Sequence, residues 1–480
     1  MAVSGARSDA QVGRGGLRPV RMPPEAWLPL VGGLVWLWNA PGHGVAGFLF
    51  SVLPGCLLLG SGVAMLLWPG DLRTSQFAAL GGVLGFLFGL PAFVFVGFFG
   101  GLAFCALSAA GFVAAGWHTL RLEPHPADVP RPEPSLLLAA EIACDEAILS
   151  TLQIGIGIPA GDELARIRGE IEEARVRFAA AGWLEKPGDY HEAPPPLSDA
   201  QVGRARVRGI DYEHLRFESG YVPRAGEPGR DRWLDYRANR TAHAWVVRRN
   251  PQRPWLVCIH GYQMGSPMVD LLAFRPEWLA RQHGLNLLLP VLPLHGPRTK
   301  GRRSGDGYLA GDILDTIHAQ TQAMWDLRRM LSWLRAEGAR EIGVFGLSLG
   351  GYNASLLAAL EPDLACVIAG IPAVDFTRLY FRHGPPVQLL EAALHGIEEH
   401  HMDEILRVVS PLAFPPRVPR GRRYIFAAIA DRLVPADQVR DLWHHWERPR
   451  IEWYQGGHVT FPRHPAVRAL IDEALGATFA

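Results

Sequence analysis

Long apolar stretches without charge mark the N-terminal part of the chain. Residues 26–70 and 74–120 contain no Asp, Glu, Lys or Arg, and a short polar break separates them. Each stretch is about twice the ~20 residues that one membrane-spanning helix requires. Asn39 to Gly44 and Gly97 to Gly101 interrupt the two stretches. The pattern predicts a transmembrane region of four helices, at about residues 24–39, 45–68, 76–96 and 99–118.

Two other interpretations of this region fit less well. Helices of a soluble domain carry a polar face, and these stretches have none. A cleaved signal peptide has an apolar core of only ~7–15 residues, far shorter than either stretch. Trp27, Trp36, Trp38, Trp68 and Trp117 lie near the predicted helix ends, as in the aromatic belt of a membrane protein. We therefore expect an integral membrane protein in contact with the lipid bilayer.

Arginine placement predicts the orientation. Four arginines precede the first apolar stretch, Arg73 lies between the stretches, and Arg121 and Arg131 follow the second. With four spans all of these lie on one side of the membrane, which the positive-inside rule makes the cytoplasmic side. Two spans would also leave the C-terminal part cytoplasmic, whereas three would place it outside.

The pattern after residue 120 predicts a connecting region and then a catalytic domain. Residues 122–134 and 192–196 are rich in proline, and the segment 135–183 between them has the periodicity of a helical hairpin. From about residue 210, strands alternate with helices, which predicts an α/β fold with a mostly parallel sheet and helices on both faces. The predicted strands include 215–221, 255–259 and 286–291. The domains expected are a polar tail (1–23), the transmembrane region (24–120), the connector (121–200) and the catalytic domain (201–480).

Charge and cysteine content narrow the function classes. The formal net charge is zero and the pI is about 7.3, so nothing indicates nucleic acid as a partner. The five cysteines are scattered and show no metal-ligand spacing, which argues against disulfide bridges and a zinc site.

The strongest chemical motif is Gly346-Leu347-Ser348-Leu349-Gly350-Gly351. It follows a predicted strand and begins a predicted helix, the context of a G-x-S-x-G nucleophile elbow. A sharp turn of this kind holds the serine in a strained backbone conformation, and the flanking glycines avoid clashes. Ser348 is therefore the candidate nucleophile.

A serine hydroxyl needs a base, and the base needs an acid to orient it. In this architecture the chain order is Ser, then Asp or Glu, then His. Asp431 follows the predicted strand 424–429, and His458 follows a short strand and two glycines. These two are the candidate acid and base, with Asp375, after the preceding strand, as the alternative acid.

An oxyanion hole is expected beside the serine. Ile259-His260-Gly261-Tyr262-Gln263 follows a buried strand. Backbone N–H groups of Tyr262 or Gln263, together with that of Leu349, are the candidate donors.

These motifs, in this order, resemble the α/β-hydrolase superfamily, and specifically its serine esterases and lipases. The resemblance covers residues 210–480 and rests on His260-Gly261, the Ser348 motif, Asp431 to Pro435 and Gly457-His458. It implies an eight-stranded sheet, a Ser-His-acid triad and catalysis without a cofactor. It does not identify the substrate.

The substrate expected is a small-molecule ester with an apolar acyl group. An insertion at about 373–420, rich in leucine and aromatic residues, is expected to cap the site. The leading hypothesis is a membrane-anchored carboxylesterase that forms an acyl-enzyme intermediate. A peptidase or thioesterase on the same fold, and a non-catalytic membrane protein with a degenerate hydrolase domain, are the alternatives.

Overall fold

The computed structural model describes residues 22–40, 44–155, 159–250, 252–309 and 311–479. The chain divides into two compact units, Met1–Glu123 and Pro124–Ala480. Each unit is described by itself below.

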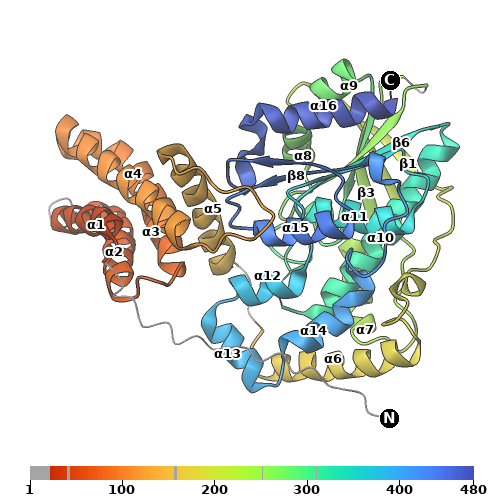
Figure 1. Cartoon of the computed structure of the whole chain (residues 1–480), viewed down its shortest axis with the longest axis horizontal. Coiled ribbons are helices and arrows are strands. Elements are labelled where there is room, and N and C mark those ends of the chain that lie inside the picture. The colour runs from red at the N-terminus through yellow and green to blue at the C-terminus, as the bar shows by residue number, and fades with distance from the viewer. Residues whose placement is uncertain (1–21, 41–43, 156–158, 251, 310, 480) are drawn as a thin grey trace, which may run out of the picture. The chain divides into compact units, whose positions relative to one another are not determined.

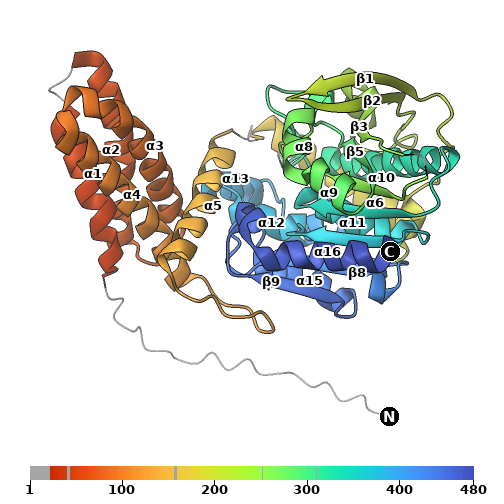
Figure 2. The same ribbon diagram turned by 90° about the horizontal axis from the view of Figure 1, so that it is seen from above.

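Apolar helices make up the described part of the first unit. Within this part, α3 packs against α2 and α4, and α1 packs against α2 and α4 (Figures 1 and 2). The elements are η1 (Pro24–Ala26), α1 (Trp27–Asn39), α2 (Gly44–Leu67), α3 (Arg73–Phe95) and α4 (Gly97–Leu122). Three of them contain segments long and apolar enough to cross a membrane: Phe50–Leu67, Arg73–Phe95 and Gly97–Leu122. At 13 residues, α1 is shorter than the ~20 that a span requires.

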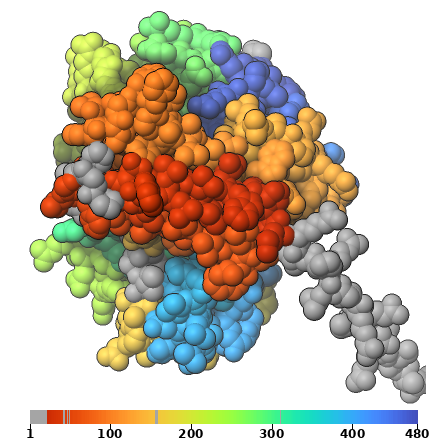
Figure 3. Space-filling view, turned by 90° about the vertical axis from the view of Figure 1, so that its left-hand side faces the viewer, coloured from red at the N-terminus to blue at the C-terminus, as the bar shows by residue number. Residues whose placement is uncertain are grey.

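Many buried residues of this helical unit are small, although Trp36 and Phe104 are also buried, and several other large apolar side chains are exposed. A Cβ atom on Gly33 of α1 would lie 2.3 Å from the backbone nitrogen of Leu59 of α2. The two helices are therefore so close that no side chain fits between them at this position. Trp38, Val94 and Phe99, by contrast, are 87%, 82% and 83% exposed. In the space-filling view the red and orange helices of this unit form a continuous surface (Figure 3). Such an arrangement suits a lipid environment, in which small residues drive close helix contact, and it indicates membrane association.

The second unit is built on one twisted sheet. In the described residues the sheet has nine strands in the order β1-β2-β3-β5-β4-β6-β7-β8-β9. The strands β1, β2, β3 and β5 pair antiparallel in that order, and all the pairs from β5 through β9 are parallel. The bounds are β1 Gln201–Val207, β2 Ile210–Glu218, β3 Thr241–Val247, β4 Trp255–Ile259, β5 Asn286–Val291, β6 Ile342–Leu347, β7 Cys366–Gly370, β8 Arg423–Ala428 and β9 Arg450–Tyr454.

Helices cover both faces of this sheet (Figure 1). Leu327 of α10, Leu357 of α11 and Leu442 of α15 are buried in the core on one face. Phe274 of α8 and Leu470 of α16 are buried in the core on the other face. The helices concerned are α8 (Pro267–Phe274), α9 (Pro276–Gln282), α10 (Ile313–Ala336), α11 (Leu349–Leu360), α15 (Ala436–His445) and α16 (Pro465–Phe479), and the short α7 (Arg230–Asp235) precedes β3.

This sheet order, with a serine turn between β6 and α11, is the α/β-hydrolase fold, so the predicted fold class is confirmed. The described sheet has nine strands where the resemblance implied eight. The first strand, β1, pairs with β2 at the edge of the sheet. Three helices, α12 (Phe376–His383), α13 (Pro386–Leu394) and α14 (Glu399–Leu406), lie between β7 and β8, where the sequence predicts a cap.

The two helices predicted in the connector are present, but they belong to the second unit. These are α5 (Leu136–Gly155) and α6 (Asp162–Ala180). α6 packs against α10 and α14, whereas α5 packs against the 3-10 turn η8 (His458–Arg463). The segment is therefore part of the second unit, and α5 lies directly beside η8, which begins with the candidate base His458.

Candidate active site

Ser348 occupies the sharp turn between β6 and α11. Its backbone has φ 56° and ψ −113°, a strained conformation for a residue with a side chain. The neighbouring strand holds the turn: the Ser348 N–H donates to the Gly370 carbonyl at 2.9 Å. The Ser348 carbonyl accepts from Tyr352 N at 3.0 Å and Ala373 N at 3.2 Å. Strain maintained by surrounding bonds is typical of a functional site.

The glycines of the motif are required by close backbone contacts. A Cβ on Gly346 would lie 2.0 Å from the Gly350 carbonyl oxygen, and one on Gly350 would lie 1.9 Å from the Ile259 carbonyl oxygen. Neither position has room for a side chain. The two glycines therefore allow β6, α11 and the end of β4 to meet at the serine.

His458 and Asp431 form a buried pair. The His458 Nδ1 atom lies 2.7 Å from Asp431 Oδ2. The other carboxylate oxygen, Oδ1, accepts from Leu433 N at 2.9 Å and Val434 N at 2.7 Å, which fixes the carboxylate plane. Burial alone would lower the pKa of His458, but the negative charges of Asp431 and Asp145 outweigh it, so the pKa lies above its usual value. This pairing is the one an acid needs in order to orient an imidazole.

Asp375, the alternative acid, has a different role. Its Oδ1 accepts from Arg378 N at 3.0 Å, which makes it the N-cap of α12, and its Oδ2 pairs with the Arg378 side chain. This carboxylate is therefore engaged in capping a helix of the insertion.

The loop after β4 passes beside the serine. A Cβ on Gly261 would lie 3.5 Å from Ser348 Cβ. The ring of His260 supports this loop, because its Nε2 accepts from Leu292 N at 3.0 Å and its Nδ1 lies 2.8 Å from the Gly261 carbonyl. Tyr262 and Leu349 line the same cavity as Ser348. Gln263 has a left-handed backbone, with φ 62°, and is not among the described residues that line this cavity.

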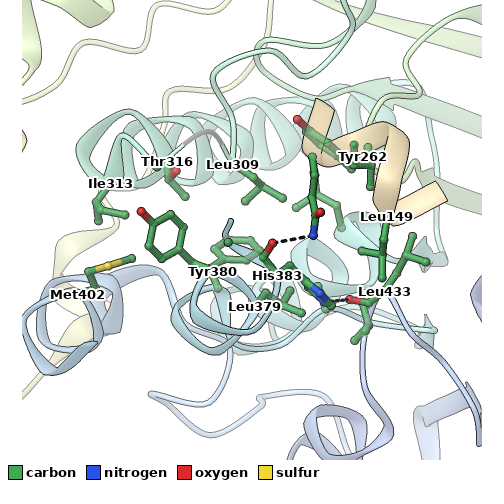
Figure 4. A pocket seen from close by; sticks show the side chains of 18 of the residues that line it. Leu149, Tyr262, Leu309, Ile313, Thr316, Leu379, Tyr380, His383, Met402 and Leu433 are labelled. Carbon is green, nitrogen blue, oxygen red and sulfur yellow. Dashed lines mark hydrogen bonds between the residues drawn. The ribbon is translucent and has the colours of Figure 1, made fainter. Parts of the chain in front are cut away.

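An apolar cavity of about 180 Å³ lies over Ser348. The cap supplies Leu379, Tyr380 and Met402, and α5 supplies Leu149 (Figure 4). Two hydrogen bonds join residues of its lining: Gln153 Nε2 donates to the His383 carbonyl at 2.9 Å, and His383 Nε2 lies 3.0 Å from the Leu433 carbonyl. The cavity is suited to an uncharged, apolar group held beside Ser348.

The structure brings the candidate site residues together in two groups. Ser348, Leu349 and Tyr262 line the cavity, and His458 and Asp431 form the hydrogen-bonded pair. Among the described residues, no hydrogen bond joins Ser348 Oγ to the His458 ring. Such bonds are often long without substrate and shorten in the complex. Within the described residues there is also no cluster of His, Cys, Asp and Glu suited to a metal.

Sequence reasoning missed the contribution of α5. Asp145 Oδ2 accepts from His458 N at 2.7 Å and from Arg432 N at 3.1 Å. The one available signal was a pair of adjacent acids, Asp145 and Glu146, in a predominantly apolar helix.

Comparison with known proteins places the chain in a family. It is 41% identical over 366 residues to uncharacterized protein MT2702 and 40% identical to uncharacterized protein Rv2627c, both of Mycobacterium tuberculosis. Each match covers 76% of this chain and 88% of the relative. The chain belongs to the family of Rv2627c. No family model matches it.

Two more distant matches are a transferase and an esterase by name. The polyketide transferase grgF of a Penicillium species is 27% identical over 158 residues, which cover 32% of this chain and 48% of that protein. Acetyl xylan esterase 1 from a Thermoanaerobacterium species matches in structure with a TM-score of 0.46 and 14% identity, covering 62% of this chain and 93% of that one.

Proposed function

We propose that this member of the Rv2627c family is a membrane-anchored serine hydrolase that cleaves carboxylic esters with an apolar acyl group. The observation that carries the proposal is the strained Ser348 turn, which lies at an apolar cavity in a domain that also holds a buried His458–Asp431 pair. A serine in this setting serves as a nucleophile once a base takes its proton.

The reaction follows from the roles of these groups. Ser348 Oγ attacks the ester carbonyl, and its proton passes to His458, which later gives it to the leaving alcohol. Asp431 holds the imidazole by the Nδ1 bond and stabilises the imidazolium. The Leu349 and Tyr262 N–H groups are the proposed donors to the oxyanion. Water then cleaves the acyl-serine ester, and the acid leaves.

The cavity directs the choice of substrate. Leucine is the commonest residue of its lining, and no described Asp, Glu, Lys or Arg lines it, so a charged acyl group would lose its hydration without gaining an ion-pair partner. The volume, about 180 Å³, suits a short or medium chain better than a long one.

A panel of p-nitrophenyl esters from acetyl to palmitoyl tests this assignment on the detergent-solubilised full chain. We expect kcat/KM to rise with acyl length, pass through a maximum at short to medium chains and then fall as the chain exceeds the cavity. Matched thioesters and anilides of the best acyl group form the control set. Faster cleavage of an anilide than of its ester would favour a peptidase, and faster cleavage of the thioester a thioesterase.

Arginine placement also supports a proposal for orientation. Arg73 begins α3 and Arg121 lies in the last turn of α4. If all four helices span the bilayer, these two residues and the four arginines that precede α1 lie on the same side. The positive-inside rule makes that side cytoplasmic, and the catalytic unit begins immediately after α4.

Protease protection tests the orientation. In intact spheroplasts we expect the catalytic unit to resist added protease, and in lysed spheroplasts to be digested. A periplasmic marker protein serves as the control for access. Digestion of the catalytic unit in intact spheroplasts would place it outside and contradict the proposal.

A further inference from the structure

A second buried carboxylate lies against the His458–Asp431 pair. Asp145 of α5 is fully buried. Its Oδ2 accepts from the backbone nitrogens of His458, at 2.7 Å, and of Arg432, at 3.1 Å. This one oxygen atom therefore binds both His458, the proposed base, and Arg432, which follows the proposed acid in the chain.

The other oxygen of this carboxylate has no hydrogen-bond partner among the described residues, although it is buried. The neighbouring Arg432 side chain pairs with Glu146, through an Nε–Oε1 distance of 2.7 Å. A buried acid with an unpaired oxygen is costly to keep charged, which is unusual for a group with only a structural role.

Titratable groups surround Asp145 on several elements. Asp431 and Arg432 follow β8, Tyr454 ends β9, and His458 and Arg463 belong to η8. Glu141, Cys144 and Glu146 lie on α5 itself. Burial and the charge of Asp431 raise the pKa of Asp145 to about 7, against the opposing effect of His458. In return, the charge of Asp145 contributes to the raised pKa of His458. Each of these two groups thus favours the charged form of the other.

We propose that Asp145 is a positioning residue that fixes the loops of the proposed base and acid, and whose charge sets the pH range in which His458 can act. The proposal rests on the proposed function, since it assigns regulation of that same site. It makes α5, which follows the membrane unit in the chain, a part of the catalytic apparatus.

The pH dependence of fluorophosphonate labelling of the full chain tests the proposal. The base must be neutral to take the serine proton, so labelling should rise with pH through the pKa of His458. In Asp145→Asn the carboxylate that favours the imidazolium is absent. We expect the midpoint of this rise to move down by about one pH unit.

Glu141→Gln is the matched control. The substitution removes one negative charge from the same helix. In the wild type, however, Glu141 Oε2 lies 3.8 Å from His464 Nε2, so the carboxylate faces His464 rather than His458. We expect its labelling profile to coincide with that of the wild type. If wild type and Asp145→Asn share one midpoint, the positioning proposal is overturned while the hydrolase assignment stands.

Thermal unfolding gives a second measurement that does not depend on activity. The folded-state pKa of Asp145 is about 7, above the ~3.9 of an unfolded aspartate. At a pH below this unfolded-state pKa, the contribution of Asp145 to stability is therefore fully present. That contribution is lost as the pH rises through the folded-state pKa. The Tm of Asp145→Asn relative to wild type should therefore increase between about pH 5 and about pH 8.

The two measurements separate the two hypotheses. An absence of labelling in the folded wild type, together with the expected Tm trend, would reject the hydrolase assignment. It would still support the proposed electrostatic effect of the Asp145 carboxylate. A Tm difference that is constant with pH would overturn the proposal for Asp145.

Discussion

A Ser348→Ala variant is expected to bind no fluorophosphonate and to hydrolyse the best ester about 10⁵-fold more slowly than the wild type. The reason is that the hydroxyl is the atom that forms the acyl-enzyme, and no other group can take its place in the turn. Alanine keeps the Cβ atom, and the three backbone hydrogen bonds of residue 348 do not involve the hydroxyl. The fold should therefore be retained while the chemistry is lost.

Ser355→Ala is the matched control for this variant. Ser355 lies on α11, is buried, and donates its hydroxyl proton to the Gly351 carbonyl at 2.8 Å. Removing that hydroxyl changes the same helix without changing the nucleophile, so labelling should persist. Labelling of purified Ser348→Ala at the wild-type rate would mean that another residue reacts, and would remove the basis of the proposed function.

The parts of the fold that the sequence predicted are those with a local signal. The Ser348 motif joins a buried strand to a helix within a few residues, and the backbone geometry of that turn dictates the glycines. The strands 255–259 and 286–291 agree with the structure because each is a short, apolar run, which a fully buried strand requires.

The edge of the sheet had no comparable signal. Most residues of β1 are exposed and several are polar, so no alternation of apolar positions distinguishes it from a loop. The predicted strand 215–221 began too late and ended too late, because β2 covers Ile210–Glu218. A strand that pairs at the edge gains its stability from hydrogen bonds to its neighbour, which composition does not reveal.

The role of α5 depends on contacts between residues that are distant in the chain. Asp145 and His458 are separated by 313 positions, and nothing near Asp145 indicates which helix will lie beside η8. The cavity has the same origin, since Leu149 and Tyr380 come from different helices and meet only in the folded unit. Periodicity predicted a helix over this segment, but the partner of that helix is a tertiary property.

A second large effect on catalysis is expected at Asp431, the residue assigned as the acid in preference to Asp375. Asp431→Asn is expected to lower kcat by about 10⁴-fold. The amide retains an oxygen for the Leu433 and Val434 N–H groups, so the loop should keep its shape. Its NH₂ group, however, would then face His458 Nδ1 and favour the tautomer in which Nε2 already carries a proton. An imidazole in that tautomer cannot accept the proton of Ser348.

Asp375→Asn provides the comparison that makes this result decisive. Asparagine caps helices about as well as aspartate, so α12 should remain intact and only the ion pair with Arg378 is lost. We expect a change in kcat of less than about threefold and a loss of stability below about 1 kcal/mol, as for other partly exposed pairs. Turnover of the best ester and chemical unfolding measure both quantities. A 10⁴-fold loss in Asp375→Asn with normal turnover in Asp431→Asn would reverse the assignment, and the cap rather than the end of β8 would then have to supply the acid.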